Sequence, residues 1–287
     1  MTDLLLSILS STCIFLTFKI TEKFKTDLAK LITVNYLVAA ILGFSFNHRP
    51  VSILKILFSP WIPYALVIGL IFIAVFFLMG RSTRQSGMAV TTIAGKMSVV
   101  IPMLFSVVLF HEKLGFLKMT GLILAVAAVF LTSFKPLTKK SNFKLILLPI
   151  GIFFGTGIAD STVKYAQNHF VTNDMTMLFS AFVFFTCFVF GILNLILYNK
   201  SSFGSISIAD LIGGSFLGIV NFGSLYFFIR ALNNSHLDSS IVFGLNSLFI
   251  VLLSLLAGAG IFQEKLSKIN IAGIALAVLA ILILMSY

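Results

Sequence analysis

Apolar runs about as long as a membrane is thick follow one another along the whole chain, with short polar turns between them. Of the 287 residues, 59% are hydrophobic and only 10% are charged, and the mean hydropathy is +1.10. A soluble fold cannot bury that much apolar surface and still keep a wettable exterior. A helix needs about 20 apolar residues to cross the hydrocarbon layer. The sequence therefore predicts an all-α membrane protein.

Ten such runs can be distinguished, and each is predicted to form one transmembrane helix. Their predicted limits are 3–20, 28–46, 62–80, 88–109, 115–133, 145–164, 174–197, 209–231, 238–260 and 268–286. The turns between the runs leave no room for a soluble domain. The first lysine is Lys19, so no basic leader precedes the first run, and we interpret that run as a mature span rather than a cleaved signal peptide.

A sequence repeat relates the two halves of the chain. The segment from Gly87 to Thr132, which contains two apolar runs and a charged turn, recurs near the C-terminus. At a shift of 262 − 110 = 152 positions, "FHEKL" (Phe110–Leu114) coincides with "FQEKL" (Phe262–Leu266). At the same shift, Gly121, Ala125 and Ala128 coincide with Gly273, Ala277 and Ala280. The sequence therefore predicts a duplicated unit.

We expect residues 1–134 and 144–287 to form one five-helix repeat each, joined by a basic linker of residues 135–143. Because five is an odd number, the second repeat would enter the membrane from the opposite side. Inverted repeats of this kind occur in many secondary transporters. The predicted fold is thus ten transmembrane helices arranged as two inverted five-helix repeats.

The basic residues indicate how the chain lies in the membrane. The formal net charge is +11, but Lys and Arg occur singly or in small groups between apolar runs, which is not typical of a nucleic-acid-binding face. The loops richer in Lys and Arg are predicted to be cytoplasmic, and this places both termini outside. We expect a cytoplasmic (inner) membrane protein that contacts lipid and a small-molecule substrate and binds no nucleic acid.

The sequence shows no pattern of an enzyme or a metal protein. Cys13 and Cys187 lie inside apolar runs, where they behave as small hydrophobic residues. The four histidines fall at turns without metal-ligand spacing, and no Ser, His and Asp set or buried carboxylate pair is evident. We predict no catalytic residue, no metal site, no cofactor and no enzymatic activity.

Lys96 is the residue most indicative of function. It lies eight residues into the fourth predicted span, which is about 12 Å along the helix axis at 1.5 Å per residue. A cationic side chain at such depth costs at least about 2.5–3.5 kcal/mol. Three interpretations remain open: the ammonium group binds a substrate carboxylate or phosphate, it titrates with a transported proton, or carbonyl groups freed by Pro102 cap it.

Asp160 is the one acidic residue clearly inside a predicted span. Its simplest interpretation is an i,i+4 ion pair with Lys164. A proton or charge relay with Lys96 is the alternative, although the two residues would lie about 10 Å apart in depth on helices that run in the same direction. The remaining candidates for a substrate-binding cavity are polar residues within spans, namely Ser11, Thr92, Asn221, Tyr226, Asn246 and Ser247. Buried amides of this kind often tie helices together instead.

Small residues at helical spacing predict close contacts between helices. They form one stripe in the fifth span, one in the tenth, and a pair, Gly214 and Gly218, in the eighth. We interpret them as packing surfaces within one chain, with a dimer interface as the alternative use. Both a monomer and a homodimer remain open.

Taken together, the ten spans, the duplication and the two turns "FHEKL" and "FQEKL" resemble the drug/metabolite transporter superfamily, in particular its ten-span EamA-like branch. The resemblance covers nearly the whole chain. It implies a central cavity lined by the first, third, fourth, sixth, eighth and ninth spans and opened alternately to either side. In two respects the chain departs from relatives: the first span lacks the common Trp-Gly pair, and it lacks the acidic residue of the small multidrug branch.

The resemblance implies a secondary active transporter of a small organic metabolite that works by alternating access. With Lys96 facing the cavity, the expected substrate is anionic or zwitterionic: an amino acid, or a phosphorylated or carboxylated compound. An exporter of neutral sugars, amines or drugs is the first alternative. A membrane-embedded lipid-handling or structural protein is the alternative from another class.

Overall fold

The computed structural model is a bundle of helices, and no strand occurs in the part of the chain that it describes. The described residues are 1–47, 56, 58–102, 104–105, 115–133, 144–172, 175–198, 206–234 and 239–285. The helices within these ranges are α1 (Thr2–Lys23), α2 (Leu28–Ser45), α4 (Ile62–Gln85), α5 (Met88–Met97), α7 (Phe116–Ser133), α8 (Lys144–Phe170), α9 (Thr176–Tyr198), α10 (Ile208–Asn234), α11 (Ser239–Gly260) and α12 (Lys268–Met285).

Each predicted apolar run corresponds to one of these helices. Six of them, α1, α2, α4, α8, α9 and α10, are long and apolar enough to cross a membrane. The apolar stretches in α5, α7, α11 and α12 are shorter over the residues described. The structure therefore has the helical composition of a multi-pass membrane protein.

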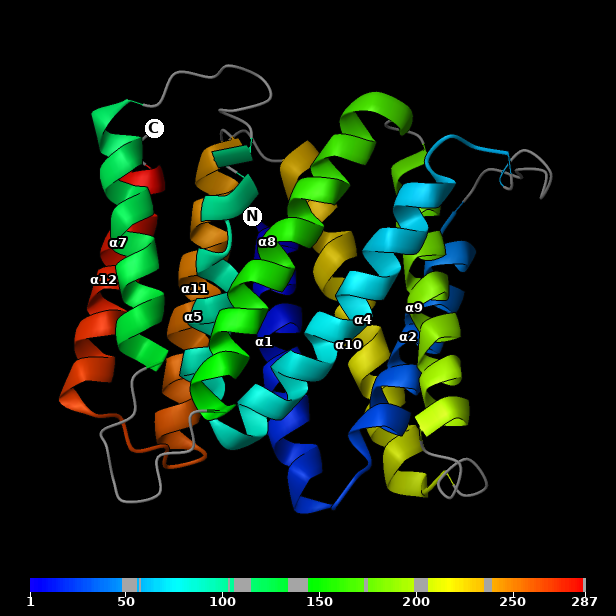
Figure 1. Cartoon of the computed structure of the whole chain (residues 1–287), viewed down its shortest axis with the longest axis horizontal. Helices are drawn as coiled ribbons and strands as arrows, with labels where there is room; N and C mark the ends of the chain where they lie inside the picture. The colour runs from blue at the N-terminus through cyan, green and yellow to red at the C-terminus, as the bar shows by residue number, and fades with distance from the viewer. Residues whose placement is uncertain are drawn as a thin grey trace.

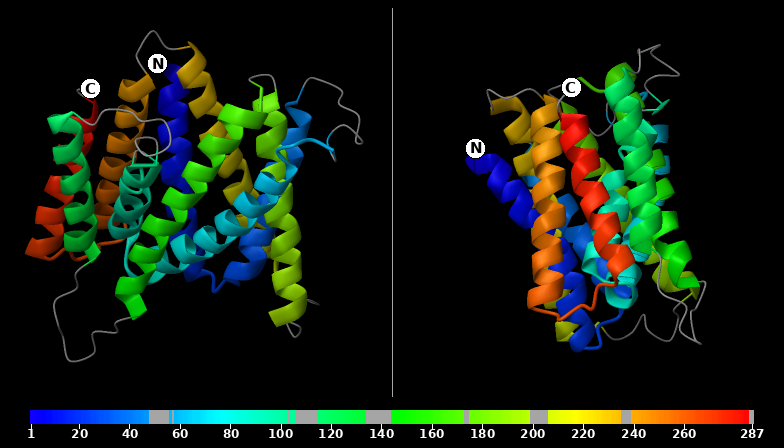
Figure 2. Two further views of the ribbon diagram at one scale, coloured as in Figure 1. Left: turned by 45° about the horizontal axis from the view of Figure 1, so that its top comes forward. Right: turned by 90° about the vertical axis from the view of Figure 1, so that its left-hand side faces the viewer.

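The helices form a flattened bundle with two flanks and a middle (Figure 1). Helices α7 and α12 pack together at one flank, and α2 and α9 pack together at the other. The middle holds α1, α4, α5, α8, α10 and α11, which contact one another. These six correspond to the spans that the family resemblance places around a cavity. The two further views show the same arrangement (Figure 2).

The packing of the first five helices is matched by that of the last five. If α8 to α12 are taken as counterparts of α1, α2, α4, α5 and α7, the α1–α10 contact matches α8–α4, and α2–α10 matches α9–α4. The α1–α11 contact likewise matches α8–α5, and α5–α7 matches α11–α12. Three further contacts, α2–α9, α5–α11 and α7–α12, each join a helix to its own counterpart.

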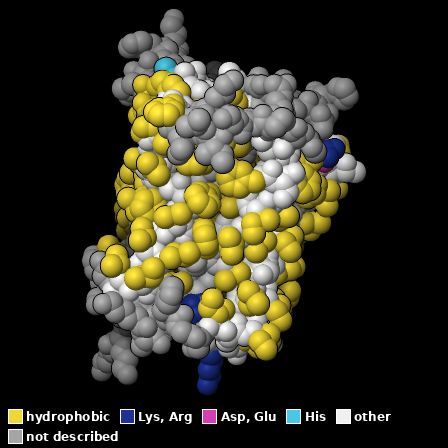
Figure 3. Space-filling view, turned by 90° about the vertical axis from the view of Figure 1, so that its right-hand side faces the viewer, with side chains coloured by type: hydrophobic (Ala, Val, Ile, Leu, Met, Phe, Trp, Pro, Cys, Tyr) yellow, Lys and Arg dark blue, Asp and Glu magenta, His cyan; other side chains and the backbone are white. Residues whose placement is uncertain are grey.

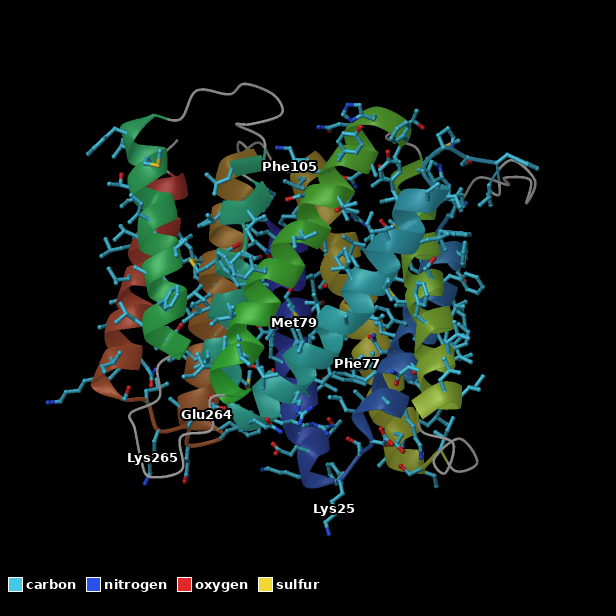
Figure 4. All side chains as sticks on the ribbon, viewed as in Figure 1. Lys25, Phe77, Met79, Phe105, Glu264 and Lys265 are labelled. Atoms are coloured by element: carbon cyan, nitrogen blue, oxygen red, sulfur yellow. The ribbon has the colours of Figure 1, made fainter. Side chains whose placement is uncertain are left out.

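The surface is apolar in the middle and charged toward the ends. Figure 3 shows hydrophobic side chains over the middle of one face, with Lys and Arg at its right-hand edge and near its lower end. Side chains such as Leu70 and Phe130 are 52% and 62% exposed. Both termini lie at one end of the bundle (Figures 1 and 2), and Lys25 and Lys265 lie at the opposite end (Figure 4), called here the lysine-rich end.

Small residues lie where helices approach most closely, as the sequence predicts. A Cβ atom on Gly218 of α10 would come within 2.6 Å of the Asn35 carbonyl oxygen in α2. A Cβ atom on Gly273 of α12 would come within 2.8 Å of Thr132 in α7. These stripes thus serve contacts within one chain, and they fix the two flanks of the bundle.

Candidate functional site

The fourth predicted span is interrupted shortly after Lys96. Helix α5 ends at Met97, and helical conformation resumes at Val100. Pro102 has no N–H group, so it cannot donate to the Ser98 carbonyl four residues earlier. The Ile101 N–H donates to that carbonyl instead, at 2.9 Å. The helix is thus interrupted near Pro102, but the Ser98 carbonyl is not left free. Residues 103 and 106–109 of the predicted span lie outside the described residues.

Lys96 lies in the last turn of α5 and is partly exposed. On the other side of the same helix, Ile93, Ala94 and Met97 are buried in a core that includes Ile152 of α8. Among the described residues, the Lys96 ammonium group has no hydrogen-bond partner. The interpretation in which freed carbonyl groups cap this lysine is therefore not supported.

Asp160 lies in the middle of α8, and its side chain is exposed. Phe154 and Ile158, which are 54% and 50% exposed, mark the outward face of this helix. Because successive residues are rotated by about 100° in a helix, Asp160 projects from roughly the opposite side. Its exposure thus indicates accessible space on the inner side of α8.

Lys96 and Asp160 interact electrostatically across the α5–α8 contact. Gly95 packs against Ile152 and Gly157 against Ile101, so the main chain at Asp160 lies about 10 Å farther along the bundle at 1.5 Å per residue. This estimate agrees with the offset expected from the sequence. These two described side chains form no direct ion pair.

The expected i,i+4 pair between Asp160 and Lys164 stays a prediction. Among the described residues, Lys96 is the electrostatic partner of Asp160. This electrostatic interaction crosses the α5–α8 contact. Helix α8 crosses the bundle obliquely (Figure 1), so neighbouring groups on it do not share a depth with their counterparts on α5.

Thr156 also lies at this site, although the sequence pattern does not single it out as a candidate. It lies one turn before Asp160 on the same face of α8. Its Oγ1 atom is buried and has no hydrogen-bond partner among the residues that the structure describes. By contrast, the hydroxyl groups of Ser161 and Thr162 donate back to the carbonyls of Gly157 and Ile158 at 2.7 and 2.8 Å. Its position four residues before Asp160 is the sequence feature that indicates a shared helix face.

Thr92 lies one turn before Lys96 on α5 and is buried. Its hydroxyl group donates to the Met88 carbonyl at 2.8 Å. The proton of this hydroxyl is therefore committed to the helix itself, and only its oxygen lone pairs remain for a ligand.

Asn221 and Tyr226, both on α10, lie apart from Lys96. The Asn221 side-chain amide donates to Asn35 Oδ1 at 3.2 Å and ties α10 to α2 at a flank. The Tyr226 hydroxyl accepts from Arg230 at 3.4 Å, and Arg230 Nε lies 3.4 Å from Asp3 Oδ1. That cluster lies at the end of the bundle that carries the termini. Both residues have structural partners, so neither is brought to the α5–α8 charges.

Ser11, Asn246 and Ser247 lie on the inner helices α1 and α11. Asn246 is held by Ser7, whose hydroxyl group lies 3.3 Å from Asn246 Oδ1 and 3.0 Å from the Ser224 carbonyl. Ser11 is buried and Ser247 is partly exposed. Since α1 and α11 both contact α5, these groups form a second polar region of the inner helices, separate from the Lys96 and Asp160 site.

Comparisons with known proteins give the fold but no activity. No protein-family model matches the chain. A Haemophilus influenzae protein, described as an uncharacterized protein, is 29% identical over 291 aligned positions, which cover 98% of this chain and 96% of that protein. A protein crystal structure is similar with a TM-score of 0.62 and 17% identity, and the match covers 98% of this chain and 96% of that one. The fold is therefore shared with a known structure over nearly the whole of both chains.

Proposed function

We propose that this protein is a secondary active transporter of a small zwitterionic metabolite with the chemistry of an amino acid. The observation that carries the proposal is the pair of Lys96 and Asp160. These two opposite charges are accessible inside an apolar helical bundle, interact without touching, and lie beside an interrupted helix. Interrupted helices with unpaired polar groups are typical substrate sites of transporters.

The charges narrow the class of substrate. A charged group inside a membrane is costly unless it is paired or solvated, and it marks a functional site. A substrate carboxylate would bind the Lys96 ammonium, and a substrate ammonium would bind Asp160, so that both charges gain a partner. A purely anionic substrate would be attracted by Lys96 but repelled by Asp160. A zwitterion therefore fits better than an anion, and the Thr156 hydroxyl supplies one further hydrogen bond.

The matched packing of the two halves supports the remaining parts of the proposal. It is the pattern expected of two inverted five-helix repeats with ten spans, as in the EamA-like branch of the drug/metabolite transporter superfamily. Alternating access would follow if the halves rock about the inner helices and expose the site to either side. We place the lysine-rich end in the cytoplasm, so that both termini lie outside the cytoplasmic membrane.

The test is transport by the purified protein in proteoliposomes. A panel of radiolabelled amino acids, carboxylates, sugar phosphates, sugars and amines would be offered with and without a pH gradient. We expect saturable uptake of a zwitterion. Lys96→Gln and Asp160→Asn should each lower it about ten- to a hundredfold, because a hydrogen bond to a charged group contributes about 1.5–3 kcal/mol. Lys265→Gln, which alters an exposed lysine, should leave uptake unchanged.

Each contrary result would point to a different function. Unchanged transport by folded Lys96→Gln protein would remove this lysine from the substrate site. Uptake of neutral sugars would favour the sugar exporter, and uptake of amines with dependence on Asp160 alone would favour an amine carrier. No flux with any compound would favour a lipid-handling or structural protein.

A further inference from the structure

At the lysine-rich end, the side chain of Glu264 in the second half of the chain contacts residues of the first half. Glu264 lies in the turn between α11 and α12, within the "FQEKL" motif. Its two carboxylate oxygens accept from the Met88 N–H at 3.1 and 3.0 Å, at the start of α5. The same carboxylate lies 3.7 Å from the Lys19 ammonium of α1. Figure 4 shows Glu264 at the end of the bundle that also carries Lys25 and Lys265.

Lys19 of α1 connects the Glu264 carboxylate to the end of α4. Its ammonium group donates to the carbonyls of Thr83 and Arg84 at 3.3 and 3.2 Å. These carbonyls lie in the last turn of α4, where acceptors have no partner within the helix. One ammonium group thus holds α1, the end of α4 and the α11–α12 turn together.

The main chain leaves room for a carboxylate at this point and for little else. Gly87 has a φ of 106°, and a Cβ atom there would come within 2.8 Å of Glu264 Oε2. A Cβ atom on Gly258 would come within 2.7 Å of the same oxygen. The Glu264 N–H donates to the Gly258 carbonyl at 2.9 Å, which fixes the turn. The side chains of Lys19 and Glu264 are only 19% and 13% exposed.

The contact between Glu264 and the start of α5 lies nearer the lysine-rich end than Lys96, which is on the same helix. Gly87 precedes Lys96 by nine positions, or about 13 Å at 1.5 Å per residue. Between them, Met88, Thr91 and Thr92 are all fully buried. Farther along the bundle, Asp160 is exposed. Among the described residues, the part of α5 between Glu264 and Lys96 is therefore buried, whereas Asp160 is exposed.

We infer that Glu264 is a releasable latch that closes the lysine-rich end of the transport pathway, and that this end opens when the carboxylate leaves Lys19 and the start of α5. The inference rests on the proposed function and adds a gate to it. The latch consists of polar contacts near the edge of the bundle, which water can replace on opening. A packed apolar core would offer no such exchange.

The experiment measures access to a cysteine between the latch and Lys96. In a background with Cys13→Ala and Cys187→Ala, a Thr92→Cys reporter is reacted with a membrane-impermeant maleimide from each side of oriented vesicles. With Glu264 intact, reaction from the lysine-rich end should be slow. Glu264→Gln should speed it at least about tenfold and slow reaction from the opposite end. Glu264→Asp, which is one methylene shorter, and Lys19→Gln should act in the same direction.

Glu22→Gln is the matched control. Glu22 also lies 3.7 Å from Lys19, but it belongs to α1 itself and does not join the two halves. Its loss should leave the labelling rates unchanged. Equal rates in the Glu264, Lys19 and Glu22 variants, with monodisperse protein, would overturn the latch and leave Glu264 as a helix cap. Because the readout needs no substrate, a failed transport assay and a failed latch remain distinguishable.

Discussion

Polar residues inside the bundle fall into two classes at the scale of single residues. One class is committed to structure: Asn221 is bound to Asn35, and the Thr92 hydroxyl is bound within its own helix. The other class has no hydrogen-bond partner among the described residues; it includes Lys96, Asp160 and Thr156, and also the buried hydroxyl groups of Thr83, Ser86 and Ser254. Lys96, Asp160 and Thr156 are the members of this class at the α5–α8 contact, where we propose that the substrate binds.

Thr156→Val separates a ligand contact from a structural one. The hydroxyl has no partner to lose, so its removal should leave thermal stability unchanged or raise it slightly. Substrate affinity should fall about tenfold, as expected for one lost hydrogen bond of about 1.4 kcal/mol. The measurements are KM in proteoliposomes and Tm in detergent.

The matched control for Thr156→Val is Thr162→Val, whose hydroxyl donates within α8. That substitution should leave KM unchanged. An unchanged KM in both variants would place Thr156 outside the substrate site.

At the scale of elements, α5 differs from its counterpart α11. Helix α5 is interrupted after Met97, whereas α11 is continuous from Ser239 to Gly260. The break follows from the missing N–H of Pro102 and leaves Lys96 in a terminal turn. A terminal turn can move a side chain with less disturbance of the hydrogen bonds than a helix interior can.

Pro102→Ala should restore the missing donor to the Ser98 carbonyl and lengthen α5. Because proline costs about 3 kcal/mol inside a helix, the variant should be more stable, with a Tm higher by a few degrees. Transport should fall, since Lys96 would then be held in a helix interior. Pro149→Ala is the control, because Pro149 lies within α8 away from the break. Faster transport by Pro102→Ala would contradict a functional interruption.

Close packing between α2 and α10 gives a second prediction at this scale. Gly218→Ala would bring a methyl group within 2.6 Å of a main-chain oxygen that cannot easily shift. We expect a loss of about 1–3 kcal/mol in the free energy of unfolding, as for other overpacked sites. Gly260→Ala, where a Cβ would meet nothing within 4 Å, should be neutral or slightly stabilising. Thermal unfolding of both variants is the check, and equal Tm values would argue against this packing.

The sequence predicts these elements well because hydropathy determines them. The run predicted at 28–46 is α2 at Leu28–Ser45, and Pro102 indicates its own break. Contacts between helices cannot be predicted from hydropathy in the same way. The partnership of Asp160 with Lys96 depends on the direction of a side chain, and the contact of Glu264 with Met88 joins residues 176 positions apart. Neither follows from spacing along the chain, although the repeated "EKL" motif marks Glu264 as notable.

On the scale of the whole molecule, the two ends of the bundle differ in charge and in the chain ends they carry. Lys25 and Lys265 lie at one end, and both termini lie at the other. The grouping of these lysines agrees with the predicted division of basic loops into two sides. The positive-inside rule then predicts which end faces the cytoplasm, and this sets the orientation of every helix in the bundle.

Topology mapping in intact cells tests the orientation. Single cysteines introduced by Lys25→Cys and Lys265→Cys should react with an impermeant maleimide only after the membrane is permeabilised. A tag at the C-terminus should be accessible without permeabilisation, because the lysine-rich end is expected to be cytoplasmic. The reverse pattern would turn the molecule over in the membrane without changing its fold. Labelling of the two cysteines from different sides would contradict the fold itself.

The two proposed repeats differ in their chemistry, since Leu248 and Ser254 in α11 stand where the first repeat has Lys96 and Pro102. In the carrier that we propose, the inward-facing and outward-facing states would therefore not be mirror images. Its half-saturation concentrations at the two membrane faces should therefore be unequal. The final distribution of the cargo would still be set by its gradient and by any coupled ion, because a carrier changes rates and not equilibria.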